Sequence, residues 1–254
     1  MSQLTCRLCF SREPNMKAHI MAEGLLKLIN LNPNKYEPNF IMLSDEYKKP
    51  KHRPTGSYDP TILCNVCDNK IGVWDEEAIK MCRREDFIKH PSSAGWTLDD
   101  VDHVKLKLFF LSYIWRASIT ALPEFSKLIL GQKHEEIIRK ILVNSDPRDV
   151  DSYSVLVGKF TLPDEKKTWG KNVLLPVNNR FLKRLSVDVY LPNMYKIIVK
   201  TDSQPYDRSL LAAADAILLG TTDSVFVFDM GDYRESKEFA IMHKMIFSDK
   251  ERVK

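Results

Sequence analysis

"CRLCF" at residues 6–10 and "LCNVCDN" at residues 63–69 are the stretches that decide the N-terminal fold, because each contains a C-x-x-C pair. Zinc favours four thiolate or imidazole ligands in a tetrahedron, and one tight turn brings the two sulfurs of each pair together. The sequence therefore predicts a four-cysteine zinc site. Its expected ligands are Cys6, Cys9, Cys64 and Cys67.

The long separation of the two pairs is compatible with such a site. Loop closure grows only logarithmically with length, so tens of extra residues cost on the order of 1 kcal/mol. Zinc binding contributes roughly 10 kcal/mol or more, which outweighs that cost. Four sulfurs leave no open coordination position, so we expect the zinc to be structural. The alternative is that the cysteines are small buried residues, as we expect for the fifth, Cys82.

Length and composition predict an ordinary globular protein. The chain has 254 residues and is 44% hydrophobic, enough for one large domain or two small ones, which we divide at 1–90 and 91–254. Its N-terminus lacks the regions of a signal peptide, so we expect a cytoplasmic location. The most apolar run, Leu108 to Leu122, contains Arg116 and is shorter than the roughly 20 residues that cross a bilayer. We therefore expect a buried helix there and no membrane partner.

The pattern of elements predicts an α+β fold with an N-terminal treble-clef-like zinc finger, central helices and a strand-rich C-terminal region. Apolar spacing predicts a helix over residues 16–29 and another over 69–90, after the second cysteine pair. One pair would then occupy a knuckle and the other the start of a helix. Such a layout is typical of a treble-clef finger.

Helices and strands are expected in separate parts of the remaining chain. A helix is predicted over residues 97–120, with Thr97 as its N-cap, and another over 134–145. Runs of β-branched and aromatic residues then predict strands, with Pro192-Asn193 at the turn of a hairpin. These strand segments are 153–162, 185–200 and 224–231, followed by a closing helix over 234–247.

A C-x-x-C pair, then His19-Ile20, then "LCNVC" opening a helix resemble the zinc-stapled form of the HNH (ββα-metal) endonucleases. "HIMAEGLL", "ILCNVCDN", "FFLSYIWRAS" and "LGQKHEEIIR" also resemble an uncharacterised group of bacterial proteins sometimes labelled HNH-like. The nuclease-like part covers about the first 80 residues. The resemblance implies DNA or another nucleic acid as partner, with a role in bacterial defence or mobile elements.

The resemblance also implies roles for single residues. In the nuclease family a histidine activates water, an asparagine orients it, and a divalent ion stabilises the phosphorane charge. His19 matches the general base, Asp59 the position of the asparagine, and Asp68 the position of a metal-binding histidine. A catalytic site of this kind would hold Mg²⁺ or Mn²⁺. Ala18 stands where the family has a metal-binding histidine or aspartate, and this departure favours a degenerate nuclease motif.

Two functions from different classes remain open. One is a metal-dependent HNH-type endonuclease with His19 as general base. The other is a catalytically silent zinc module that recognises nucleic acid or another protein. In the second case His19 would be hydrogen-bonded within the finger, Asp68 would cap a helix and Asp59 would be a turn residue before Pro60.

Basic residues in the segment between the cysteine pairs add a candidate nucleic-acid surface. "KKPKHRP" at residues 48–54 could follow a phosphate backbone, although a solvated loop is the alternative. Its candidate contacts are Lys48, Lys49, Lys51 and Arg53. Arg116 lies in an apolar helix, where a buried guanidinium needs a carboxylate partner. Glu135 and Arg139 are four residues apart, a spacing that suits a helical ion pair.

Overall fold

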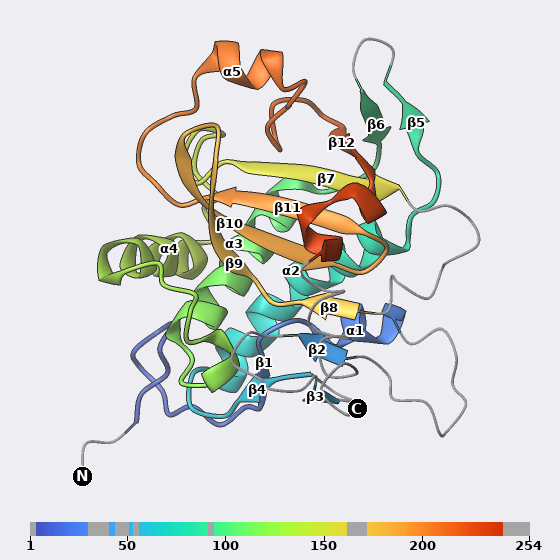
Figure 1. Cartoon of the computed structure of the whole chain (residues 1–254). Helices are drawn as coiled ribbons and strands as arrows, with labels where there is room; N and C mark the ends of the chain where they lie inside the picture. Colours follow the sequence, from blue (N-terminus) through green and yellow to red (C-terminus); the bar gives the residue numbers. More distant parts are fainter. Residues whose placement is uncertain are drawn as a thin grey trace, which may run out of the picture.

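A computed structural model of the protein describes residues 4–29, 41–43, 51–52, 56–90, 94–161 and 172–240. The fold is mixed α+β, as expected from the sequence (Figure 1). Its main element is a seven-stranded sheet of order β5-β6-β12-β7-β11-β10-β9. The pairing of β7 with β12 is parallel and all other pairings in this sheet are antiparallel. The strands are β5 Ile88–Lys89, β6 Gly95–Leu98, β7 Val155–Thr161, β9 Val177–Phe181, β10 Arg184–Leu191, β11 Tyr195–Lys200 and β12 Val225–Asp232.

The hairpin of β10 and β11 confirms the predicted turn. Leu191 pairs with Tyr195, so Pro192, Asn193 and Met194 form the connection. Asn193 has φ 59° and Met194 φ 67°, both in the left-handed region. Asparagine tolerates that region better than most residues, which explains its position after the proline.

The helices differ in length. The long helices are α2 Asn65–Arg83, α3 His103–Ile119 and α4 Gln132–Asn144. The shorter ones are α1 Glu23–Ile29, α5 Arg208–Ala213 and the 3₁₀ turns Pro123–Phe125 and Tyr233–Glu235. Residues 237–240 are helical, and the rest of the predicted closing helix lies outside the described residues.

The prediction that Thr97 caps a long helix was wrong. Thr97 lies in β6, paired with Phe226 of β12 and Ile88 of β5. The helix α3 starts at His103, and its N-cap is Asp102, whose carboxylate accepts a hydrogen bond from Lys105 N at 3.0 Å. Pairing with a distant strand therefore overrides the local capping signal.

The prediction of a helix over residues 16–29 was wrong in its first half. Ala18–His19 forms strand β1 and pairs antiparallel with β4, Tyr58–Asp59. The helix α1 begins only at Glu23. Because the partner strand lies some forty residues away, the apolar spacing alone could not reveal the extended conformation.

Three further short strands join the segment between the cysteine pairs to the C-terminal half. They form a sheet of order β3-β2-β8, in which β2 runs parallel to β8 and antiparallel to β3. Their bounds are β2 Ile41–Leu43, β3 Lys51–His52 and β8 Asn172–Leu174.

The main hydrophobic core fills the space between α2, α3 and one face of the sheet. Alternate residues of β11 separate the two faces: Ile197 packs in this core, whereas Ile198 packs on the other face with Leu211 of α5. The main core also contains Cys6 and Leu8, so it runs continuously across the predicted boundary at residue 90. The apolar helix α3 is buried over most of its length, as expected. Among the described residues, none of the helices is long and apolar enough to cross a membrane.

Candidate metal centre

The two C-x-x-C pairs come together as predicted. The sulfurs of Cys6, Cys9, Cys64 and Cys67 all lie within 4.8 Å of one another. The Cys9 and Cys64 sulfurs are 3.9 Å apart. Within the described parts of the chain, no other group of three or more histidine, cysteine or acidic side chains is this close. The cluster could hold a metal ion such as zinc.

Each cysteine pair is positioned by its local backbone structure, the first by a turn and the second by the start of α2. Cys6 and Cys9 lie in a turn in which Phe10 N donates to Cys6 O at 2.9 Å, and Phe10 adopts φ 57°. Cys64 is the N-cap of α2, and Cys67 lies in its first turn. The Cys64 side chain makes no capping hydrogen bond, which leaves the thiol available to a metal.

Backbone hydrogen bonds hold the segments that carry the two cysteine pairs next to each other. Arg7 N donates to Ile62 O at 2.8 Å, and Asn15 N donates to Leu63 O at 3.1 Å. The side chain of Asn15 also accepts a hydrogen bond from Asn65 N at 2.8 Å, at the start of α2. These bonds help to offset the entropy of closing the long segment between the pairs.

Burial and neighbouring groups shift the pKa values of Cys6, Cys9 and Cys67. Burial raises the pKa of Cys6, and burial together with the neighbouring cysteines raises that of Cys67. Burial would also raise the pKa of Cys9, but hydrogen bonds from Ser11, Cys6 and Cys67 together outweigh it and lower the pKa to about 6. The Ser11 hydroxyl lies 3.2 Å from the Cys9 sulfur. A divalent cation would favour four thiolates here, because it offsets their mutual repulsion.

Arg139 of α4 holds the turn of Cys6 and Cys9 against the helices. Arg139 Nη1 donates to Leu8 O at 2.7 Å, and its guanidinium lies 4.3 Å from the centre of the Phe10 ring. Arg139 pairs with Glu136, at 2.7 and 2.9 Å, and not with Glu135 as the spacing suggested. Glu135 instead accepts a hydrogen bond from a serine of α3. The contact with Leu8 was missed because 131 residues separate the partners.

Asp59 forms a structural contact between β4 and the end of α3. It is only 4% exposed and accepts hydrogen bonds from Thr61 N at 2.8 Å, Thr61 Oγ1 at 2.6 Å and Thr120 Oγ1 at 2.6 Å. Burial would raise the pKa of Asp59, but these donors outweigh it and hold the pKa below its usual value. Its oxygens are therefore already occupied by protein donors.

His19 and Asp68 lie on different elements near the cysteine cluster. His19 is half-buried on β1, and its ring lies edge-on to Tyr58, with 6.1 Å between ring centres. Asp68 is half-buried in the first turn of α2, beyond the N-cap position expected for it. In the described structure, His19, Asp59 and Asp68 do not converge within metal-binding distance of one another. The hypothesis that these three side chains share one ion therefore lacks the required geometry.

Arg116 has the carboxylate partner expected for a buried guanidinium. Its Nη2 lies 3.1 Å from Asp75 Oδ1 of α2, and its side chain is 1% exposed. Arg116 Nη1 also donates to His19 O at 2.6 Å. Burial raises the pKa of Asp75, although the charge of Arg116 opposes this. Arg116 thus joins α2, α3 and the β1 strand of the finger.

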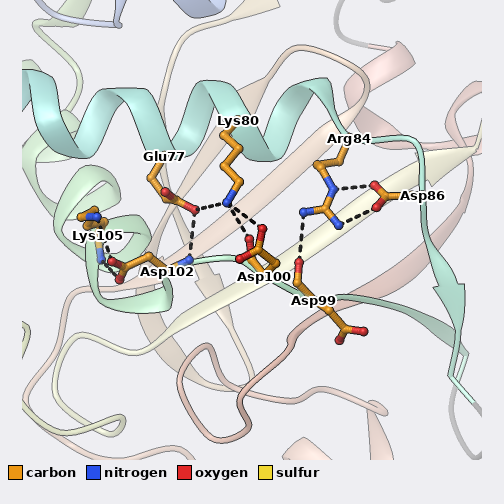
Figure 2. Close-up of polar contacts among 8 residues, drawn as sticks. All are labelled: Glu77, Lys80, Arg84, Asp86, Asp99, Asp100, Asp102 and Lys105. Carbon is orange, nitrogen blue, oxygen red and sulfur yellow. Dashed lines mark hydrogen bonds and ion pairs between the residues drawn. The ribbon is translucent and has the colours of Figure 1, made fainter.

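A second polar network fastens the end of α2 to the loop before α3 (Figure 2). Glu77 accepts a hydrogen bond from Asp102 N at 3.0 Å, and Lys80 lies 3.2 Å from Asp100 Oδ2. Arg84 donates to Asp86 and, at 3.0 Å, to the carbonyl oxygen of Asp99. This cluster of acidic side chains is therefore paired with cations and backbone N–H groups.

The structure describes only residues 51–52 of the basic segment at residues 48–54. Lys48, Lys49 and Arg53 lie outside the described residues, and only the backbone of Lys51 is described, in β3. Among the described residues near the first cysteine pair, Arg7, Arg12 and Lys17 are exposed.

The chain was compared with known proteins in three ways. Neither a protein-family model, nor a curated protein, nor a solved structure matches it.

Proposed function

We propose that the protein binds one structural zinc ion through Cys6, Cys9, Cys64 and Cys67. The close approach of the four sulfurs supports this proposal. Four thiolates complete a tetrahedral shell, so the ion would have no open position for substrate and would act as a staple. The staple would hold the N-terminal turn against the start of α2.

The order of elements around the cluster supports a treble-clef-like finger. The first cysteine pair lies in a turn, the β1–β4 pairing follows, and the second pair opens the long helix α2. The long segment between β1 and β4 would be an insertion in this finger.

We further propose that the finger contacts nucleic acid and does not itself cleave it. The net charge of +4 and the exposed Arg7, Arg12 and Lys17 support binding to phosphates. Ala18, the engaged carboxylate of Asp59 and its separation from His19 and Asp68 favour a degenerate motif over an active one. A non-catalytic protein-interaction module is the alternative if nucleic acid does not bind.

An HNH-type endonuclease is a second candidate because His19 keeps acidic neighbours. Asp75 interacts electrostatically with both His19 and Asp68. His19 could then act as general base with Mg²⁺ or Mn²⁺ held by the aspartates of α2.

Cleavage and binding assays separate these functions. Wild type and His19→Ala are incubated with plasmid DNA and with RNA in Mg²⁺ or Mn²⁺, and binding is followed by fluorescence anisotropy. We expect binding that weakens with salt and no cleavage by either protein. Cleavage that requires His19 would establish the nuclease instead, and absence of binding would favour the protein-interaction module.

The matched variant Arg7→Gln/Arg12→Gln/Lys17→Gln tests the surface. These side chains are exposed, so the variant should fold and retain its metal. Its affinity for nucleic acid should fall with a smaller salt dependence, because fewer phosphates are neutralised. Unchanged affinity would place the contact surface elsewhere.

A further inference from the structure

A small pocket lies beside the N-terminal turns of α3, away from the cysteine cluster. Its volume is about 120 Å³, and it is bounded by α3, by residues 147–150 and by Leu219 and Gly220. Gly220 has φ 88°, and a Cβ on it would lie 3.3 Å from the His103 ring. The glycine therefore allows the backbone to form a close wall of the pocket.

Lys107 lines this pocket and is a buried cation with few partners. It is 4% exposed, and its Nζ donates to the carbonyl oxygen of Asp149 at 2.7 Å. An ammonium group has three donors, and burying a charge is costly unless it is paired. Within the described chain, Lys107 Nζ has this one acceptor and lies within ion-pair distance of no carboxylate.

The nearby carboxylates are engaged elsewhere. Asp149 accepts hydrogen bonds from Ser152 Oγ at 2.9 Å, Ser152 N at 2.8 Å and Asp151 N at 3.0 Å. Asp151 pairs with Arg208 at 2.7 Å. Their charges, and that of Asp146, therefore act on Lys107 only from a distance.

The balance of charge around Lys107 leaves its ammonium incompletely compensated. Burial, together with the charge of Lys200, lowers the pKa of Lys107 to about 8, although the charges of Asp149, Asp151 and Asp146 oppose the shift. Arg148 adds a second cation at the pocket, and His103 is the first residue of α3. The N-terminal end of this helix is already capped by the carboxylate of Asp102, so the two side-chain cations provide the positive charge at the pocket.

We propose that this pocket binds a small oxyanion, a phosphate or carboxylate group, through Lys107 and Arg148 at the start of α3. The oxyanion would supply the acceptors that the Lys107 ammonium lacks. Its negative charge would be favoured by both cations. This site is independent of zinc and of the proposed contact with nucleic acid.

The experiment compares binding of inorganic phosphate and of acetate by wild type and Lys107→Met. Binding is measured by calorimetry on the full chain at pH 7 and fixed ionic strength, and the melting temperature is recorded with and without anion. We expect Lys107→Met to weaken binding of the preferred anion at least about tenfold, because a charge-assisted hydrogen bond is of that order. Without anion, its melting temperature should equal or exceed that of wild type, because an unpaired buried charge has been removed.

Two further variants keep the test independent of folding defects. Lys105→Met removes an exposed cation of the same helix and should leave anion affinity unchanged. Arg148→Asn removes the exposed cation at the pocket while keeping a residue that tolerates its φ of 59°, and it should weaken binding.

The two anions distinguish the chemistry of the ligand. A preference for phosphate would identify a phosphoryl group, and a preference for acetate a carboxylate. Absence of binding to both, or equal binding by wild type, Lys107→Met and Arg148→Asn, would overturn the proposal.

Discussion

The finger, the N-terminal region that holds the four cysteines (residues 4–29 and 56–67), is stabilised differently from the seven-stranded sheet. In the sheet, β11 is buried along its whole length and hydrogen-bonded on both sides. The finger instead contains strands of only two residues, and its turns meet at four sulfurs. The sheet is packed on both faces, whereas the finger adds four cysteines and a few polar contacts to its share of the main core.

The two regions nevertheless share one core, and two arginines connect the finger to the helices. Arg116 of α3 donates to His19 O, and Arg139 of α4 donates to Leu8 O. Loss of the metal should therefore loosen the finger first, while the sheet retains its packing. Four variants test this difference, in order of decreasing expected effect.

The largest effect is expected from Cys64→Ser. Removing one of four ligands should release the metal and forfeit much of the roughly 10 kcal/mol that structural zinc contributes. Metal content and limited proteolysis would follow the change, with new cleavage in residues 4–29. Cys82→Ser is the matched control, because Cys82 is buried in α2 outside the cluster. Equal metal loss in both variants would contradict the assignment of ligands.

Arg116→Met should produce the next largest loss. The variant leaves Asp75 buried without its cation and His19 O without its donor, and breaking a buried pair costs about 3–5 kcal/mol. Unfolding in urea measures the loss. The double variant with Asp75→Asn should recover part of it, because the uncompensated charge is gone. A loss below about 1 kcal/mol would show that this pair is not a stabilising connection.

Ile197→Ala tests the sheet without touching the finger. Ile197 is fully buried in β11, so truncation should cost about 2–5 kcal/mol through lost burial and a cavity. Global stability should fall in urea while metal content and protease resistance of residues 4–29 stay unchanged. Metal loss in this variant would show that the finger and the sheet do not respond separately.

Asp59→Asn should have the smallest effect, which is present at neutral pH and disappears in acid. Burial would raise the pKa of Asp59, but hydrogen bonds from Thr120 and Thr61 outweigh it and hold the pKa low. Its stabilising contribution is therefore present above the unfolded pKa of about 3.9 and is lost as pH falls through the lower folded pKa. Acid unfolding followed by circular dichroism should show a shallower dependence on pH in the variant. An unchanged acid limb would contradict this role for Asp59.

Several parts of the fold could be predicted because their signals are local. The two C-x-x-C pairs indicated their own convergence, and the β-branched and aromatic runs in residues 185–200 indicated the hairpin with its turn at Pro192-Asn193. The apolar surroundings of Arg116 indicated that it needs a carboxylate, although not that Asp75 supplies it.

The remaining features depend on partners that are distant in sequence. Thr97 looked like a helix cap, but it lies in β6 and pairs with Phe226 of β12. Asp59 is the turn residue that its position before Pro60 indicated, since it accepts a hydrogen bond from Thr61 N, but nothing in the sequence indicated that its carboxylate also reaches Thr120. Periodicity also gave no sign that Lys107 lines a pocket, because Asp149 and Gly220 reach it only in the folded chain.

The most direct test of the zinc staple is the metal content and coordination of the purified wild-type protein. Elemental analysis should find about one zinc per chain, and X-ray absorption should show four sulfur ligands at about 2.3 Å. A protein that folds without metal, or a zinc bound through nitrogen or oxygen ligands, would contradict the proposal that zinc joins the finger to α2.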